Sequence, residues 1–451
     1  MKYKVKLAAL SVMLCANAIA DPVYLPPGPN LTYGSSSNNQ SIMSSITNPA
    51  AAAAQLGKED SQYRFGILSS IGGGYEFGNV NDLYNKIDAT KTQLKAAQAI
   101  PPSVIAGGGA AVATYINTNL IAPVNSVTSA LQQEGYASVF FDGHIPLTPL
   151  VVTKKGLGGS IVLDANVSAI ANVSFIADPF ANLTTAQGNA IITGGGTYTP
   201  AANESSLLAK AAVVGEVGLG YSRPVLRRET GDLTAGVRAK YYMVKLARNA
   251  QQQTSASAGG AQSTLKASQT YTSNSGVGLD VGTLWTAKRY RLGAWVNNLN
   301  KPSFKYNDLT AADLTAKGYT PGTAIYNQLA AGETYEMKPQ LELEGAFFSE
   351  SQNWVLNAAL DGNAVPDPVG RDFQWATLSA AYATNSWWVP GIRLGYRTNL
   401  AGSKLSYATG GLTLFKALSL DVAYGLDSIT DSNGKSIPRS AMINLGLQMT
   451  F

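Results

Sequence analysis

The sequence is poor in the side chains on which most enzymes depend. Its 451 residues include only one cysteine and one histidine, and 14% of them are charged, against about 25% in soluble globular chains. One imidazole and one thiol leave little material for nucleophilic, zinc or haem chemistry. We therefore expect no enzyme activity, no metal site and no cofactor.

Long hydrophobic runs are also missing. Hydrophobic residues make up 45% of the chain, but no stretch after residue 20 reaches the ~20 apolar residues that a membrane-spanning helix needs. This composition disfavours both a highly charged soluble protein and a bundle of membrane helices.

The first twenty residues have the pattern of a secretory signal peptide. A basic start, Lys2, Lys4 and Lys6, precedes a short apolar run, and the small residues Ala18 and Ala20 end it. This order is typical of a cleavable export signal. We predict that residues 1–20 are removed.

Cleavage would leave a chain without cysteine, because the one cysteine is Cys15. Leu14 before it does not fit a lipoprotein signal, which has a small residue at that position. The loss of three lysines leaves 30 basic against 28 acidic residues. This balance gives no support for nucleic-acid contact.

Two regions do not have the pattern of strands. Residues 21–60 are rich in Pro, Ser and Asn and predict a loop-like segment, free or packed against something. Residues 82–135 have helical spacing, with a first helix over 82–98, a break at Gly108 and a second helix that ends at Gly135. We interpret 82–135 as a mainly helical insertion in a domain that spans 61–451.

Elsewhere apolar and polar residues alternate, which predicts strands with one apolar face. Over 160–176, for example, Ile161, Leu163 and Val167 share one face, and Asp164 and Asn166 the other. About 14 such strands are predicted, near 62–76, 136–143, 158–178, 207–222, 233–249, 273–286, 289–298, 334–348, 353–362, 372–383, 388–398, 403–414, 417–426 and 440–451.

Charged residues lie in the middle of the polar faces. They are Asp164, Glu216, Arg238, Lys240, Asp280, Arg289, Arg291, Glu342, Glu344, Asp361, Arg393, Arg397 and Asp421. A wet or ion-paired lumen accommodates such side chains, and a closed barrel leaves no unpaired strand edge in lipid. Six basic and seven acidic residues favour mutual ion pairs over a ring of one sign that selects ions. Asp280 and Arg393 are our choices for lumenal anchors.

The sequence ends on an alternating strand with an aromatic last residue. Leu445, Leu447, Met449 and Phe451 share its apolar face. This ending resembles the terminal signal that the barrel assembly machinery of bacterial outer membranes reads. We predict an all-β protein, a transmembrane antiparallel barrel in the outer membrane of a Gram-negative cell, in contact with its lipid. Aromatics at strand ends would form the interfacial girdles: Tyr75, Tyr221, Trp285, Trp354, Trp388, Tyr396 and Tyr424.

Several short motifs together resemble the FadL superfamily of hydrophobic-compound channels and, within it, the TraF-like conjugal transfer proteins. They are the proline-rich start, Asn48-Pro49-Ala50-Ala51, Gly72-Gly73-Gly74, Gly278–Trp285, Arg291-Leu292-Gly293, Asn297-Asn298-Leu299, Pro302-Ser303-Phe304, Ala359-Leu360-Asp361 and Gly391–Arg397. The resemblance implies a barrel of about 14 strands with residues 21–60 folded inward as a plug that includes Asn48, Pro49 and Ala50. The thioredoxin-like protein that shares the TraF label is a different molecule, since this chain has no Cys-x-x-Cys.

Two candidate sites remain. His144 is the only imidazole, and we interpret it as a polar residue at a strand end rather than a catalytic base. The glycine runs lack phosphate-loop spacing. FadL-type channels open laterally through a kinked strand, and Gly156, Gly158 and Gly159 could serve such a kink.

Two functions stay open. One is a plugged channel for hydrophobic small molecules, gated by the plug. The other is a structural scaffold that docks conjugal transfer proteins through the insertion at 82–135. An insertion on the periplasmic side would favour the scaffold, and one that covers an extracellular apolar cleft would favour transport.

Overall fold

The computed structural model describes residues 22–34, 41–54, 61–79, 89–90, 92, 100–198, 203–252, 270–383, 386–430 and 434–450. The predicted signal peptide, most of the predicted first helix at 82–98 and Phe451 lie outside these residues.

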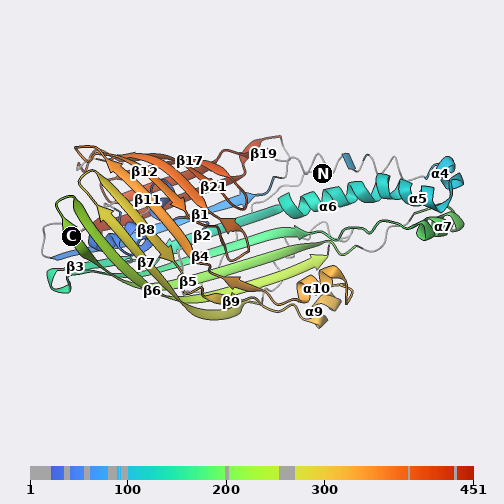
Figure 1. Ribbon diagram of the computed structural model, residues 1–451, viewed down its shortest axis with the longest axis horizontal. Helices are drawn as coiled ribbons and strands as arrows, with labels where there is room; N and C mark the ends of the chain where they lie inside the picture. The colour runs from blue at the N-terminus through green and yellow to red at the C-terminus, as the bar shows by residue number, and fades with distance from the viewer. Residues whose placement is uncertain are drawn as a thin grey trace.

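The described strands close into one antiparallel barrel (Figure 1), as the sequence predicts. β1 pairs with β21 on one side and with β2 and β3 on the other, which closes the sheet. The fourteen barrel strands are β1 (Ser61–Phe77), β2 (Tyr136–His144) continued by β3 (Leu150–Lys154), β4 (Gly159–Ile176), β5 (Ser206–Arg228), β6 (Gly231–Gln252), β7 (Thr272–Thr286), β8 (Tyr290–Asn297), β11 (Gln340–Phe348), β12 (Trp354–Asp361), β15 (Trp375–Tyr382), β16 (Gly391–Asn399), β17 (Ser406–Leu414), β18 (Leu418–Gly425) and β21 (Ser440–Thr450).

The barrel is polar inside and apolar outside. On β4, Asp164 and Asn166 are fully buried, whereas Leu163 between β3 and β5 is 42% exposed. Leu292 on β8 and Leu394 on β16 are exposed in the same way. An apolar outer band is what a lipid-facing barrel needs. Among the described residues, no helix is long and apolar enough to cross a bilayer.

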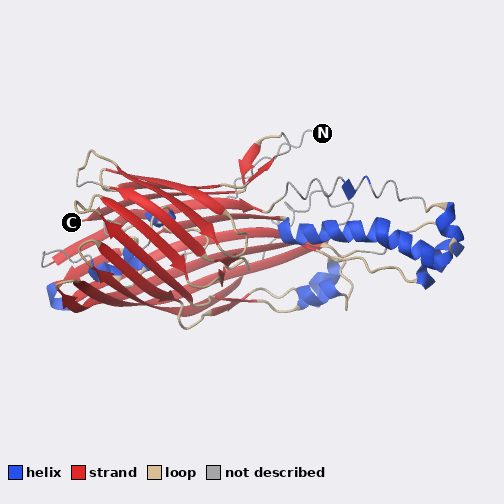
Figure 2. Ribbon diagram, turned by 45° about the horizontal axis from the view of Figure 1, so that its top comes forward, coloured by secondary structure: helices blue, strands red, loops and turns tan. Residues whose placement is uncertain are grey.

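The two ends of the barrel differ. One end carries short turns, such as 229–230 between β5 and β6 and 287–289 between β7 and β8. The other carries long loops that hold most of the helices (Figure 2). These loop elements are α4 (Pro102–Ala106), α5 (Gly108–Ile116), the π-helix η2 (Asn117–Ile121), α6 (Ala122–Glu134), α7 (Thr185–Thr193), β9 (Ser303–Lys305), α9 (Ala311–Ala316), α10 (Ala324–Ala330), β10 (Thr334–Glu336), β13 (Val365–Pro366), β14 (Asp372–Phe373), β19 (Ser428–Thr430) and β20 (Ser436–Pro438).

The strand boundaries differ from the prediction at prolines. The predicted strand 334–348 is divided by Pro339 into the short hairpin strand β10 and the barrel strand β11. Proline has no N–H for a ladder, so a strand does not run through it. In the same way Pro146 and Pro149 interrupt the second barrel strand, and β3, its second half, was not predicted.

Candidate functional site

The buried charges of the lumen form separate ion pairs rather than one ring. Arg238 on β6 donates from Nη2 to Asp164 Oδ2 at 3.0 Å and to Glu216 Oε1, and all three side chains are at most 2% exposed. The register of three adjacent strands brings these side chains together. Asp164 on β4 pairs with Gly218 on β5, and Arg238 on β6 pairs with Gly220, two residues farther along β5. One guanidinium thus bridges two carboxylates in the wall.

The two residues chosen as lumenal anchors lie in different pairs. Asp280 forms an ion pair with Lys240, with Nζ 2.8 Å from Oδ2, and its Oδ1 accepts from the backbone N–H of Asn298 at 2.9 Å. Arg393 donates to both carboxylate oxygens of Asp421, at 3.1 and 2.8 Å. This two-point geometry is the strong form of an arginine–carboxylate contact. Of the other predicted charges, Arg291 lies over the ring of Phe348, and Glu344 accepts from the side chain of Asn357. Arg289 was wrongly predicted as lumenal, because it is 49% exposed in the β7–β8 turn and pairs with Glu350.

The N-terminal residues 22–34 and 41–54 are bound to inward-facing side chains from several parts of the barrel. They contain η1 (Gly28–Leu31), α1 (Ser44–Thr47) and α2 (Ala51–Ala54), and nearly every residue in them is buried. The side chains of Ser70 and Gln448 accept from the backbone N–H groups of Gly28 and Ile42. The side chains of Arg397, Arg238 and Trp375 donate to the carbonyl oxygens of Asn30, Ile46 and Val23. These contacts attach the segment to opposite walls.

Asn48, Pro49 and Ala50 rest on a flat patch of the wall. Gly236 and Gly282 are cross-strand partners on β6 and β7. A Cβ on Gly236 would lie 2.1 Å from Pro49 O, and one on Gly282 would lie 2.4 Å from Asn48 Oδ1. Asn48 also donates to Thr283 O at 3.2 Å. The two glycines therefore allow the backbone of the segment to contact the strands directly.

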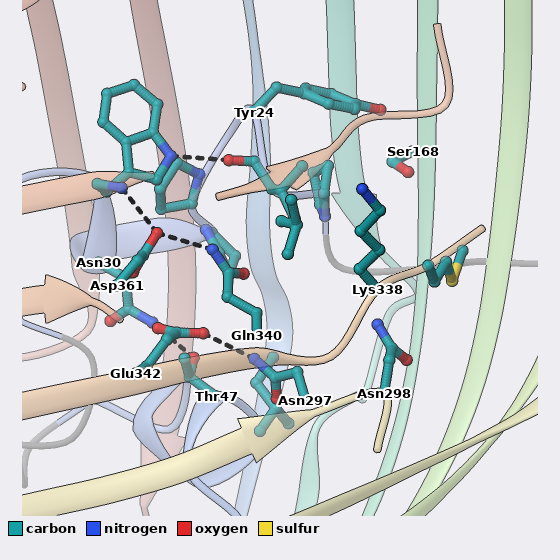
Figure 3. Close-up of a pocket in the computed structure, with 18 of the residues that line it drawn as sticks. Tyr24, Asn30, Thr47, Ser168, Asn297, Asn298, Lys338, Gln340, Glu342 and Asp361 are labelled. Carbon is teal, nitrogen blue, oxygen red and sulfur yellow. Dashed lines mark hydrogen bonds between the residues drawn. The ribbon is translucent and has the colours of Figure 1, made fainter. Parts of the chain in front are cut away.

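A cavity of about 140 Å³ lies between this segment and the barrel wall (Figure 3). Its lining includes the aromatic and apolar side chains of Tyr24, Trp375 and Met337. Its polar and charged lining comprises Asn30, Thr47, Ser168, Arg238, Lys240, Asn297, Asn298, Lys338, Gln340, Glu342, Asp361, Thr377 and Arg397.

Glu342 and Asp361 lie directly opposite each other on β11 and β12. Asp361 Oδ2 accepts from Gln340 at 2.8 Å and from the Trp375 N–H at 2.7 Å. Glu342 Oε1 accepts from Asn297 at 2.7 Å. Like charges directly across a strand pair repel each other. The sequence predicted these charges as lumenal, and the structure brings them to one cavity.

The wall is irregular at residues 145–149, between β2 and β3. His144 pairs with Asn166 and Leu150 with Leu163, so five residues here face only two on β4. Ile145 and Leu147 on the extra length are 42% and 60% exposed. Two hydrogen bonds hold this part of the chain to β1: the N–H of Gly66 donates to Pro149 O, and Ser69 Oγ donates to Thr148 O. The irregularity thus lies upstream of the predicted kink, because Gly156 and Gly158 lie in the β3–β4 turn and Gly159 is the first residue of β4.

His144 is buried beside this irregularity. Its Nε2 lies 3.7 Å from Asp164 Oδ1, and both side chains are fully buried. The position is on the inner wall of the barrel at the end of β2, which agrees with a structural polar residue. Among the described residues, no group of three or more His, Cys, Asp or Glu side chains is arranged to hold a metal ion.

Residues 100–135 and 177–198 form an extension that projects from the long-loop end (Figure 1). α5, η2 and α6 run on from Gly108 to Glu134, which corresponds to about 40 Å of helix. Gly108, with a φ of +79°, separates them from α4, where a break was predicted. Apolar side chains of α5 and η2 pack with those around α7.

Amide side chains fasten the helix to the returning chain. Asn117 exchanges two hydrogen bonds with the backbone of Leu183, at 2.7 and 3.0 Å. Asn125 does the same with Phe180, at 2.8 Å each. Gln132 accepts from the N–H of Ala177. We name residues 100–135 with 177–198 the stalk; these contacts bind its two halves along its length.

The long loop between β12 and β15 lines part of the cavity at the stalk end. Arg371 in the loop 362–374 pairs with Glu76 on β1 and lies over the ring of Tyr136. Asp367 in the same loop accepts from the N–H groups of Val369 and Arg371. Burial outweighs these hydrogen bonds and raises the pKa of Asp367 to about 7.

Some of these features have no signal in the sequence. The asparagine contacts of the stalk join residues 66 and 55 positions apart, and asparagine spacing alone does not identify such partners. Gly236 and Gly282 carry a weak signal, because glycine inside a strand often marks a close backbone approach. Of the predicted terminal signal, Leu445 points outward and is 41% exposed, and Leu447 is half-buried.

Residues 45–361 match the family described as F plasmid transfer operon, TraF, protein. No curated protein matches the chain. Among solved structures, the toluene transporter TodX of Pseudomonas putida is 13% identical, with 94% of this chain and 96% of that one covered and a TM-score of 0.37. A FadL homologue of Pseudomonas aeruginosa is 11% identical, with 97% and 98% covered and a TM-score of 0.36. CdiB from Acinetobacter baumannii is 9% identical, with 70% and 50% covered and a TM-score of 0.28.

Proposed function

The chain belongs to the family of the F plasmid transfer operon TraF protein, as its motifs indicated, and we propose that it serves conjugal transfer as an outer-membrane barrel that presents the stalk to a partner at the cell surface. Outer-membrane barrels have short periplasmic turns and longer extracellular loops. By this rule we infer that the stalk lies outside the cell. We also propose that the predicted signal peptide exports the chain.

The composition of the stalk is the observation that carries the proposal. Residues 100–133 and 179–198 contain no Asp, Glu, Lys, Arg or His. A well-solvated protein surface normally has about 25–35% charged residues. Depletion of charge is instead typical of the core of a protein–protein interface. The stalk therefore has the composition of a surface that becomes covered.

The rigidity of the stalk supports the same role. The paired amide contacts of Asn117 and Asn125 hold the helix against the returning chain, so little conformational entropy is lost when a partner binds. The stalk projects away from the barrel and lines neither the cavity nor the irregular wall. A periplasmic insertion was expected of a scaffold, and the loop rule instead places the stalk outside. Because the stalk covers no cleft, however, a docking element fits its placement better than a cover for a transport cleft.

A deletion separates the stalk from the barrel. Phe77 and Ala137 are cross-strand partners, so a short Gly-Ser turn in place of residues 80–134 can join β1 to β2. We expect the variant to assemble, as judged by heat-modifiable mobility in gels, and to lose at least tenfold in conjugation frequency. A matched deletion of 308–331, between the paired strands β9 and β10, should retain transfer. Normal transfer without the stalk would contradict the proposal.

Point variants test the surface without removing it. Ala106 and Ala110 are exposed at the far end of the stalk, and Ala312 is exposed on α9. Ala106→Glu with Ala110→Glu should lower transfer, because a charged group must lose its water when the partner covers it. Ala312→Glu is the control and should have no effect. Equal transfer by both variants would show that the end of the stalk is not covered.

A second candidate function is passage of hydrophobic molecules through the wall at 145–149. The exposed Ile145 and Leu147, at a place where strand pairing is interrupted, favour it. We would measure uptake of a labelled long-chain fatty acid by cells that lack other such channels, with and without this gene. Saturable uptake that depends on the gene would support a channel. If uptake is the same with and without the gene, although the barrel is folded in the membrane, the docking role is favoured.

A further inference from the structure

We propose that the cavity between the N-terminal segment and β11, β12 and β16 is a binding site for a small zwitterion that carries one ammonium and one carboxylate, such as an amino acid. This site is independent of the stalk and of any transfer role. The inference rests on the charges around the cavity, their partners and its size.

The acidic side of the cavity has one negative charge in excess. Glu342 and Asp361 are neighbours across two strands, and neither forms an ion pair with another residue of the described chain. Arg397 lies near both, but its guanidinium is bound to Asn30 O, Thr377 Oγ1 and the ring of Trp375. Two carboxylates beside one guanidinium leave a place for one further cation.

The opposite side of the cavity has one available positive charge. Of the other cations that line it, Arg238 and Lys240 already pair with carboxylates. Lys338 is exposed and has no hydrogen bond or ion pair within the part of the chain that is described. Figure 3 shows Lys338 near Ser168, with Gln340 between it and the side of the cavity that holds Glu342 and Asp361.

The polar groups of the lining match such a ligand. Its ammonium supplies donors for Glu342, and its carboxylate supplies acceptors for Lys338. Arg397 Nη1 is buried and lacks a hydrogen-bond partner among the described residues, so a polar ligand suits this lining better than an apolar one.

The size and the walls limit the ligand to a small molecule. About 140 Å³ is below the ~300–1,000 Å³ of pockets for drug-sized ligands. The apolar wall of Val214, Met337 and Trp375 suits a few methylene groups. A long hydrocarbon chain does not fit this volume, and a purely apolar ligand would leave the excess carboxylate and Lys338 without a partner of opposite charge.

The test compares three probes of equal chain length. The full-length barrel in detergent micelles is titrated by calorimetry with 4-aminobutyrate, n-butyrate and n-butylamine, each up to millimolar concentration. We expect 4-aminobutyrate to bind at least tenfold more tightly than the other two. Equal binding of either single-charge probe, or no detectable heat with 4-aminobutyrate, would overturn the proposal.

Two variants identify the groups that bind. Lys338→Met should weaken 4-aminobutyrate binding about tenfold and leave n-butylamine unchanged, and Glu342→Gln should weaken 4-aminobutyrate in the same way. Lys305 is exposed on β9 at the same end and does not line the cavity, so Lys305→Met is the matched control. Because Lys338 is exposed, its variant folds even if the Glu342 variant does not. An equal loss with Lys305→Met would contradict the assigned role.

Discussion

Replacement of Arg238 by Met should destabilise the barrel more than most single changes. Arg238 is 2% exposed and is the guanidinium that bridges Asp164 and Glu216, so its removal leaves two buried carboxylates without their partner. Breaking a buried ion pair in this way costs about 3–5 kcal/mol. The lost hydrogen bond to Ile46 O adds about 1 kcal/mol and loosens the N-terminal segment.

The assay is equilibrium unfolding of the refolded barrel in guanidinium, followed by tryptophan fluorescence. The free energy of unfolding should fall by about 4–6 kcal/mol in Arg238→Met. The triple variant Asp164→Asn, Glu216→Gln, Arg238→Met is the control, because it removes all three charges and should recover most of the loss. A single variant within 0.5 kcal/mol of the parent, or a triple variant less stable than the single one, would refute the reasoning.

Three further predictions concern the stalk, a covering loop and the strand end. Asn125→Ala should make the stalk exchange amide hydrogens faster around Phe180, because about 1–3 kcal/mol is lost with two hydrogen bonds; exposed Thr118→Ala is the control, and equal protection in both would contradict the clamp. The pKa of Asp367 is raised to about 7, so the folded loop 362–374 binds more protons than the unfolded one and should lose stability as pH rises from about 4 to 7. Hydrogen exchange of that loop should show this trend, and Asp367→Asn should abolish it. Removal of Phe451 should block membrane insertion; normal outer-membrane levels would count against the terminal signal.

The sequence predicts the barrel because its physical cause is local. Alternation along one strand, such as Leu163 and Asp164, decides which side chain meets lipid and which meets the lumen. The strand positions follow from this pattern except at Pro339 and at residues 145–149, where proline interrupts the hydrogen bonds between neighbouring strands and ends a strand early. The break at Gly108 was also predictable, since a helix rarely continues through such a glycine run.

The sites depend on pairing between distant strands and were only partly predictable. The charges Glu342 and Asp361 were recognised as lumenal, but their common cavity requires the register of β11 on β12 and the position of Trp375. The helices α7, α9 and α10 were not predicted, because each is short and gains its stability from contacts with the barrel end or the stalk. The end of the barrel that carries the insertion was not predicted, because it depends on which connections are short, and the strand order of the structure is needed to identify them.

Labelling of single cysteines in intact cells tests the central claim most directly. The one cysteine, Cys15, lies in the predicted signal peptide, so an introduced cysteine reports alone. We would compare Ala110→Cys at the end of the stalk with Thr230→Cys in the β5–β6 turn, using a maleimide that does not cross membranes. If the stalk lies outside the cell, Ala110→Cys is labelled in intact cells and Thr230→Cys only after the outer membrane is opened. Labelling of Thr230→Cys but not Ala110→Cys in intact cells would contradict this placement.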